Sequence, residues 1–265
     1  MYRFAVLPYC NAAPLVYYIS DFCPSTNLVE KYPLEMSGEL KSDRVDAALV
    51  PIVDFLANED LRMVPGLGIC ADGPVESVLL RSQKPLDEVR SIRLFPESRT
   101  SNALIQVLLF QHFGANHNIR FTGDDPEADA TIMIGDKALS KDQTEYTYDL
   151  SDMWNRQTNL PFVFAVWAYK ADFLGRNNIS SILYKTKEKG CNNISILSRH
   201  HAERLSLDPA YIQHYLTDCL YYDIGPREVE SIKIFQELTA QISGDDSNVP
   251  VLSMRHPGKE NDENL

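Results

Sequence analysis

The residues from Leu94 to Gly114 hold the clearest candidate for a ligand site: an apolar strand, a turn rich in hydroxyl side chains, and an apolar helical run. The turn contains several residue types that cap helices, namely Ser98, Thr100, Ser101 and Asn102. Because the first four N–H groups of a helix lack intrahelical partners, such an end attracts anions. A capping box needs Glu or Gln three residues after the cap, and those positions hold serine and alanine. We therefore predict that a substrate carboxylate binds here; the alternative is that Ser98 or Thr100 simply caps a buried helix.

Two charged side chains border this turn and have opposite effects on an anion. Glu97 would repel it, whereas Arg99 would attract it. The predicted substrate-binding residues of the turn are Ser98, Arg99, Thr100 and Ser101.

Two further polar side chains stand beside apolar strands. Asn11 follows the strand Phe4–Leu7, and ligands of open α/β sheets bind at the carboxyl ends of strands. Its side-chain amide can both donate and accept hydrogen bonds, so Asn11 is a candidate ligand contact. The alternative is a plain turn or N-cap asparagine. Ser77 has apolar neighbours, so its hydroxyl must either bond to backbone or face a cleft, and no G-x-S-x-G marks it as a hydrolase nucleophile.

A third turn follows the apolar strand from Ala128 to Ile134. Gly135 would let backbone approach a ligand closely, and Asp136 comes next. We predict both as substrate-binding residues, with an ordinary glycine turn as the alternative.

Metal and cofactor chemistry find no support in the sequence. The five cysteines are scattered without a C-x-x-C pair, which predicts reduced thiols in a cytoplasmic protein. His200 and His201 are adjacent, so their side chains point in different directions and do not share a metal. We expect no metal and no cofactor.

Composition narrows the class of protein further. A chain of 265 residues with 44% hydrophobic content can bury one large core or two ordinary ones. The net charge of -12 opposes binding to nucleic acid or to anionic lipid. The N-terminus lacks the pattern of an export signal, and no run of about 18 apolar residues suggests a membrane span.

The elements that must position these residues alternate in type. Strands at Phe4–Leu7 and Val45–Pro51, with helical segments after each, give a β-α-β-α rhythm that predicts a parallel sheet covered on both faces. Further strands are expected at Met63–Cys70, Glu76–Arg81 and Pro161–Tyr169, the last as a central strand or one that passes between domains. Helices are expected at 101–113, Asp172–Tyr184, Lys187–His201, Asp208–Leu220 and Pro226–Ile242. The polar residues 244–265 are expected to form a disordered tail.

Several motifs in the first two-thirds of the chain resemble those of the chorismate dehydratase family of menaquinone biosynthesis, which acts in the futalosine route. They lie at residues 7–15, 45–51, 73–78, 98–101, 134–139 and 161–167. The sequence departs from the family at Asn159, where a glycine is usual, and its C-terminal third matches only in helical pattern.

This resemblance implies a fold similar to type II periplasmic binding proteins, an α/β fold in which two lobes clamp a ligand. The lobes would be residues 1–82 plus 172–243 and residues 83–171, with chain crossings near 80–84 and 169–175. The implied reaction is the loss of water from chorismate to give 3-[(1-carboxyvinyl)oxy]benzoate. Asn11 and Ser77 would be the catalytic residues that line the reacting ring.

Two other functions remain open at this point. One is a sibling lyase of the futalosine pathway, which would share the fold. The other is a non-enzymatic cytosolic protein that binds a small anion, since solute receptors and regulators use the same fold. A receptor should carry an export signal and a regulator a helix-turn-helix segment, and we see neither in this sequence.

Overall fold

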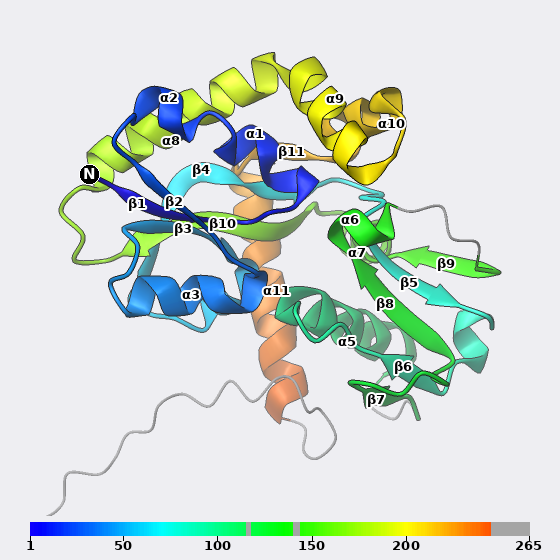
Figure 1. Cartoon of the computed structure of the whole chain (residues 1–265). Helices are drawn as coiled ribbons and strands as arrows, with labels where there is room; N and C mark the ends of the chain where they lie inside the picture. The colour runs from blue at the N-terminus through cyan, green and yellow to red at the C-terminus, as the bar shows by residue number, and fades with distance from the viewer. Residues whose placement is uncertain (115–117, 140–143, 245–265) are drawn as a thin grey trace, which may run out of the picture.

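Two β-sheets, each packed against helices, form the protein, and the helix α5 lies beside the space between them (Figure 1). We analysed a computed structural model, which describes residues 1–114, 118–139 and 144–244. The predicted tail, from residue 245 onward, lies outside the described residues.

The six-stranded sheet has the order β11-β4-β10-β3-β1-β2. The strands β1 and β3 pair in parallel, as the β-α-β rhythm predicts, while β10 runs antiparallel between β3 and β4. The apolar run that starts at Phe162 is therefore a central strand, which explains why nearly all its side chains are buried. The strands are β1 (Arg3–Val6), β2 (Asn27–Glu30), β3 (Ala47–Pro51), β4 (Leu61–Ala71), β10 (Phe162–Lys170) and β11 (Tyr221–Asp223).

The five-stranded sheet has the order β7-β6-β8-β5-β9 and is drawn on the right of Figure 1. Its central strand β8 pairs in parallel with β6 and antiparallel with β5. The strands are β5 (Val78–Ser82), β6 (Ser91–Arg93), β7 (Arg120–Thr122), β8 (Ala130–Ile134) and β9 (Tyr146–Asp149).

The chain passes between the sheets at other places than expected. The first passage lies between β4 and β5 and the second between β9 and β10, rather than near residues 80–84 and 169–175. The first difference arises because the turn around Gly73 leads β5 away to the second sheet instead of reversing the chain beside β4. The division into lobes remains a prediction, and these passages move its proposed boundaries to about 72–77 and 150–161.

Helices cover both sheets. The long helix α5 (Arg99–Phe113) matches the expected helix at 101–113, and nearly all of its first eleven residues are buried. The other helices are α1 (Ala13–Val16), α2 (Ile19–Phe22), α3 (Pro33–Lys41), α4 (Ile52–Leu56), α6 (Gly135–Ala138), α7 (Leu150–Thr158), α8 (Arg176–Asn192), α9 (Ile194–Leu205), α10 (Pro209–His214) and α11 (Pro226–Gly244). Short 3-10 helices occur at η1 (Cys10–Ala12) and η2 (Leu86–Glu88), and a π-helical turn forms η3 (Tyr215–Cys219).

The C-terminal helices differ from the expected set in one boundary. The break expected between Tyr184 and Lys187 is wrong, because α8 continues through that segment and ends near Asn193. Gly190 of α8 packs against α1 so closely that a Cβ atom there would overlap the carbonyl group of Pro14. Glycine in the middle of this helix is therefore required by a close backbone approach.

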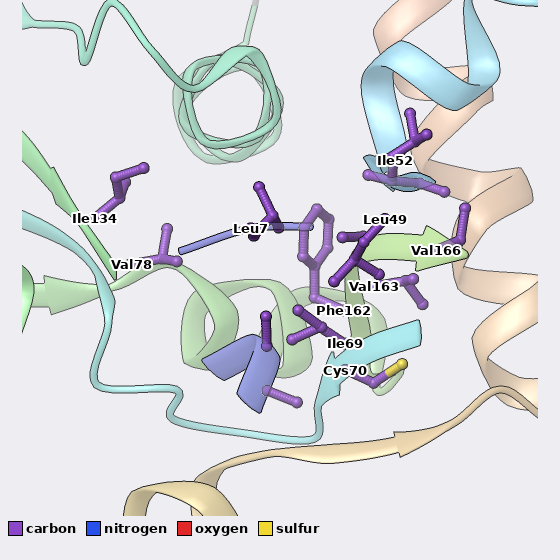
Figure 2. Packing of buried hydrophobic residues seen from close by; sticks show 14 of the residues in the cluster. Leu7, Leu49, Ile52, Ile69, Cys70, Val78, Ile134, Phe162, Val163 and Val166 are labelled. Atoms are coloured by element: carbon purple, nitrogen blue, oxygen red, sulfur yellow. The ribbon is translucent and has the colours of Figure 1, made fainter. Parts of the chain in front are cut away.

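Buried apolar side chains from both sheets point toward the space between them. Figure 2 shows Leu49 and Ile69 of the six-stranded sheet close to Leu7, with Val78 and Ile134 of the five-stranded sheet on the other side. No helix among the described residues is long and apolar enough to cross a membrane.

Candidate active site

A cavity lies between the two sheets and encloses about 550 Å³ of empty space, its open mouth included. Of this space, about 60 Å³ can hold the centres of water-sized molecules. Its walls combine strand ends from both sheets with the start of α5: Leu7, Tyr9, Asn11, Pro33, Pro51, Ile69, Val75, Ser77, Val78, Ser98, Thr100, Ser101, Ile134, Gly135, Phe164 and Ala165.

The cavity brings together most of the residues that the sequence singled out. The predicted residues that line it are Asn11, Ser77, Ser98, Thr100, Ser101 and Gly135. Arg99 and Asp136 are not among the lining residues. Their predicted roles in binding rest on the sequence alone.

The start of α5 is capped and still offers free donors. Ser98 is the N-cap, and its Oγ accepts a hydrogen bond from the N–H of Ser101 at 3.3 Å, which confirms the capping interpretation. The Oγ1 of Thr100 accepts from the N–H of Val53 at 3.4 Å. The N–H groups of Arg99 and Thr100 have no acceptor within the described chain. One side-chain cap and two available N–H groups therefore coexist at this helix end.

Asn11 presents an unsatisfied amide oxygen. Its Oδ1 is buried and has no hydrogen-bond partner within the described chain. Asn11 lies inside η1, and its side chain caps neither η1 nor α1, so the alternative of an N-cap asparagine is wrong. Because buried polar atoms are usually paired, an orphaned oxygen on a cavity wall is suited to a ligand donor.

Ser77 is held by a tyrosine far away in the sequence. The Oη of Tyr215 donates a hydrogen bond to the Oγ of Ser77 at 2.7 Å, and both residues are almost fully buried. Burial raises the pKa of Tyr215 well above its usual value, so the phenol stays protonated and acts as the donor. Because the Ser77 hydroxyl accepts this bond, its own hydrogen remains able to donate toward the cavity.

Gly135 meets the cavity with a backbone that few other residues tolerate. Its φ angle is +57°, and its N–H donates to the carbonyl oxygen of Ser77 at 2.8 Å. A Cβ atom there would lie 3.3 Å from the ring of Tyr9. The glycine thus makes a turn and also permits close packing against a cavity wall.

The two charged candidates pair with other side chains instead. A guanidinium nitrogen of Arg99 lies 2.9 Å from Asp54, a buried carboxylate whose pKa desolvation raises to about 6. The Oδ1 of Asp136 accepts the N–H of Cys10 at 2.9 Å, and its Oδ2 pairs with Arg204 at 2.5 Å. The first pair joins α5 to α4, and the second joins α6 to α9.

A family model described as menaquinone biosynthesis matches residues 2–241 of the chain. The chain belongs to this family. Its motifs had been identified by resemblance, and that identification is confirmed.

Two curated relatives of this menaquinone biosynthesis family member carry the same name. A protein of Thermus thermophilus named chorismate dehydratase is 28% identical over 251 residues, which are 86% of this chain and 92% of that protein. A protein of the same name from Campylobacter jejuni is 29% identical over 241 residues, 88% of this chain and 95% of that protein.

Solved structures show the same fold at low identity. The protein AF1704 of Archaeoglobus fulgidus aligns with a TM-score of 0.67 at 15% identity, covering 92% of this chain and 97% of that one. The alkanesulfonate-binding protein SsuA of Xanthomonas axonopodis pv. citri aligns with a TM-score of 0.62 at 16% identity, with 96% of each chain covered. The predicted periplasmic-binding-protein-like fold is thereby confirmed.

Sequence reasoning missed several cavity residues of this family member. Tyr9 and Phe164 lie inside the motifs that carried the resemblance, but their apolar rings gave no chemical signal. Burial, with the negative charge of Glu97 nearby, raises the pKa of Tyr9 to about 12. Tyr215 lay in an expected helix, and nothing in its spacing linked it to Ser77. Within residues 1–114, 118–139 and 144–244, the lining residues include no Asp, Glu, His, Lys or Arg.

Proposed function

We propose that the protein is a chorismate dehydratase, a hydro-lyase that removes water from chorismate in the futalosine route of menaquinone biosynthesis. Membership of the menaquinone biosynthesis family and the shared name of the curated relatives support this proposal. The observation that carries it is the cavity itself, where an unpaired amide oxygen, a serine hydroxyl and a helix N-terminus face one enclosed space.

Substrate charge is balanced here by dipoles. Chorismate is a dianion, and no cationic side chain of the described part of the chain lines the cavity. The free N–H group of Thr100, which lines the cavity at the start of α5, would bind one carboxylate, since the helix end carries roughly half a positive charge. The hydroxyl groups of Ser98 and Ser101 lie on the same wall. We propose that this end of the cavity fixes the orientation of the ring.

The reaction needs one proton and one hydroxide to leave adjacent ring carbons. The proton leaves the carbon that bears the enol ether oxygen, the hydroxide leaves its neighbour, and the electron pair of the C–H bond completes the aromatic ring. No electrons leave the substrate, so the reaction requires no redox cofactor. Aromatisation supplies the thermodynamic drive, and the protein contributes orientation and charge stabilisation.

Asn11 and Ser77 have suitable positions for the two polar roles. We assign to the Ser77 hydroxyl a hydrogen bond to the reacting end of the ring, because Tyr215 fixes its orientation. We assign to Asn11 a hydrogen bond that its unpaired Oδ1 accepts, with its amide hydrogens able to assist the departing oxygen. Among the described residues, no carboxylate or imidazole lines the cavity, so we assign the base to a carboxylate of the substrate itself.

The test is direct conversion. Purified protein incubated with chorismate should yield an aromatic enol ether that is lighter than chorismate by one water. Chromatography and mass spectrometry detect this product. A sibling lyase or a binding protein would leave chorismate unchanged. Calorimetric titration would then identify a binding protein, which gives heat of binding with chorismate but no turnover. Absence of the aromatic product under conditions where chorismate binds would refute the proposal.

We also propose that the enzyme works in the cytoplasm. All five cysteines are free thiols, as is usual in a reducing compartment.

A further inference from the structure

Three potential metal ligands converge beside the cavity, on residues that do not line it. They are Glu76, in the connection between β4 and β5, and His214 and Cys219 at the two ends of the η3 turn. One ligand atom from each lies within 4.8 Å of the other two. Spacing along the chain does not predict this group, because Glu76 lies more than a hundred residues before the other two.

Two of the three distances between these ligand atoms suit a tetrahedral ion, and the third, between Cys219 and Glu76, is at most 4.8 Å. The Nε2 of His214 lies 3.5 Å from the Sγ of Cys219 and 3.7 Å from the Oε1 of Glu76. Around a zinc ion with Zn–S near 2.3 Å and Zn–N near 2.0 Å, a nitrogen and a sulfur lie about 3.6 Å apart, and a nitrogen and an oxygen about 3.4 Å apart. The first pair already has this separation, and the second differs from it by a few tenths of an ångström.

The π-helical turn explains how His214 and Cys219 share a face. Residues five apart in an α-helix point about 140° away from each other. A π-helical turn bonds residue i to residue i+5 and so places the two on one side. The turn Tyr215–Cys219 therefore aligns two side chains that a regular helix would separate.

The remaining nitrogen of the imidazole is already held. The Nδ1 of His214 lies 2.7 Å from the Oδ2 of Asp218. Carboxylates that bind the second nitrogen of a histidine are the usual support of metal-ligating histidines, because they fix the ring with Nε2 toward the ion. Here that orientation presents Nε2 to both Glu76 and Cys219.

Glu76 is also held in place by its backbone. Its φ angle is +61°, in the left-handed region that non-glycine residues seldom adopt. The Oδ2 of Asp149 accepts the N–H groups of Val75 and Glu76 at 2.9 and 2.7 Å and fixes this conformation. His214 is about half exposed, which leaves an ion a path from solvent.

We propose that Glu76, His214 and Cys219 form a binding site for a single borderline divalent metal ion, best Zn²⁺, with a water molecule as the fourth ligand. The Cys219 thiol loses its proton to solvent when the ion binds, since thiolate is the ligand. The mixed sulfur, nitrogen and oxygen set favours zinc over magnesium or calcium, which prefer oxygen ligands alone. The ion would link the first passage between the sheets to the turn that carries Tyr215, and Tyr215 in turn holds Ser77.

The experiment uses the full chain, stripped with a chelator and kept reduced. Titration with Co²⁺ should reach one equivalent and give the near-ultraviolet absorption band of a cobalt thiolate, and Zn²⁺ should remove that band. Cys219→Ser should lose the band and bind Zn²⁺ at least tenfold more weakly. The matched control is Cys191→Ser in α8, a half-buried thiol that should leave both measurements unchanged. Asp218→Asn keeps all three ligands and should weaken binding by about 10- to 100-fold.

The proposal is overturned if the wild-type protein binds less than one equivalent or gives no thiolate band. It is equally overturned if Cys219→Ser binds zinc as well as Cys191→Ser does. Thermal melting of the stripped variants shows whether each is folded, and His214→Gln repeats the test if Cys219→Ser does not fold. None of these readouts uses turnover, so the result is independent of the proposed dehydratase activity.

Discussion

The buried hydrogen bond from Tyr215 to Ser77 offers a sharp test of the site, because its two partners should respond differently to mutation. Ser77→Ala removes the only acceptor of the Tyr215 phenol that is found in the described chain. Leaving a buried donor unpaired costs about 1–3 kcal/mol of unfolding free energy. Tyr215→Phe removes the donor and keeps the ring, so it should cost less, about 0.5–1.5 kcal/mol.

The double variant tests the same bond by a cycle. Once the tyrosine hydroxyl is gone, Ser77→Ala no longer strands a donor, so the two losses should fail to add by roughly 1 kcal/mol. A matched control is Ser198→Ala in α9, another almost fully buried serine, which has no partner for its hydroxyl in the described chain. That change should be nearly neutral in melting temperature.

Activity should separate the two residues further. If the Ser77 hydroxyl contacts the substrate in the transition state, Ser77→Ala lowers kcat by about 5- to 150-fold. Tyr215→Phe keeps the Ser77 hydroxyl but leaves it free to rotate, so we expect kcat to fall by about tenfold or less, with KM close to wild type. Initial rates of product formation and urea unfolding curves measure both effects. Wild-type kcat in Ser77→Ala, or strictly additive stability losses, would refute the reasoning.

Three other changes test the remaining parts of the site. Asn11→Ala should lower kcat by about 5- to 150-fold and leave the melting temperature unchanged, because its Oδ1 has no partner within the described chain to lose; a lower melting temperature would contradict this. Thr100→Asp should weaken chorismate binding at least tenfold, about 1.4 kcal/mol, in calorimetric titrations at two salt concentrations, and unaltered binding by the folded variant would exclude this helix end. Asp54→Asn should alter the pH dependence of stability. The pKa of its carboxyl is raised from 3.8 to about 6, so between these pH values the folded wild type keeps a proton that the unfolded chain releases. The free energy of unfolding of the wild type should therefore fall by roughly 3 kcal/mol as pH rises from about 4 through 6. Urea unfolding across that range should show a smaller fall in the variant, and equal slopes would contradict the assignment.

Local pattern predicted much of the fold. The β-α-β start, the long helix α5 and the central strand β10 all follow from apolar periodicity and strand propensity. The passages between sheets were misplaced because the turn around Gly73 has the composition of a hairpin turn, and only long-range packing decides where β5 goes.

Contacts between distant segments could not be predicted. The bond between Tyr215 and Ser77 spans 138 residues, and the pairing of Asp136 with Arg204 spans 68. Asp136 was predicted as a substrate contact from its place after the strand and Gly135, and in the structure its Oδ1 accepts the N–H of Cys10. A polar residue at a strand end is equally compatible with an exposed position and with a ligand contact. Only its contacts in the folded protein distinguish the two.

The close approach of α8 to α1 has a consequence for how natural variants should be interpreted. Gly190 lies outside the cavity wall, and a substitution there would ordinarily be classed as a matter of stability alone. However, any side chain at that position must displace Pro14, and the same short run of backbone continues into η1 and Asn11. A survey of tolerated substitutions should therefore find Gly190 as restricted as the residues of the cavity, and an enzyme with a larger residue there should lose turnover even where it still folds.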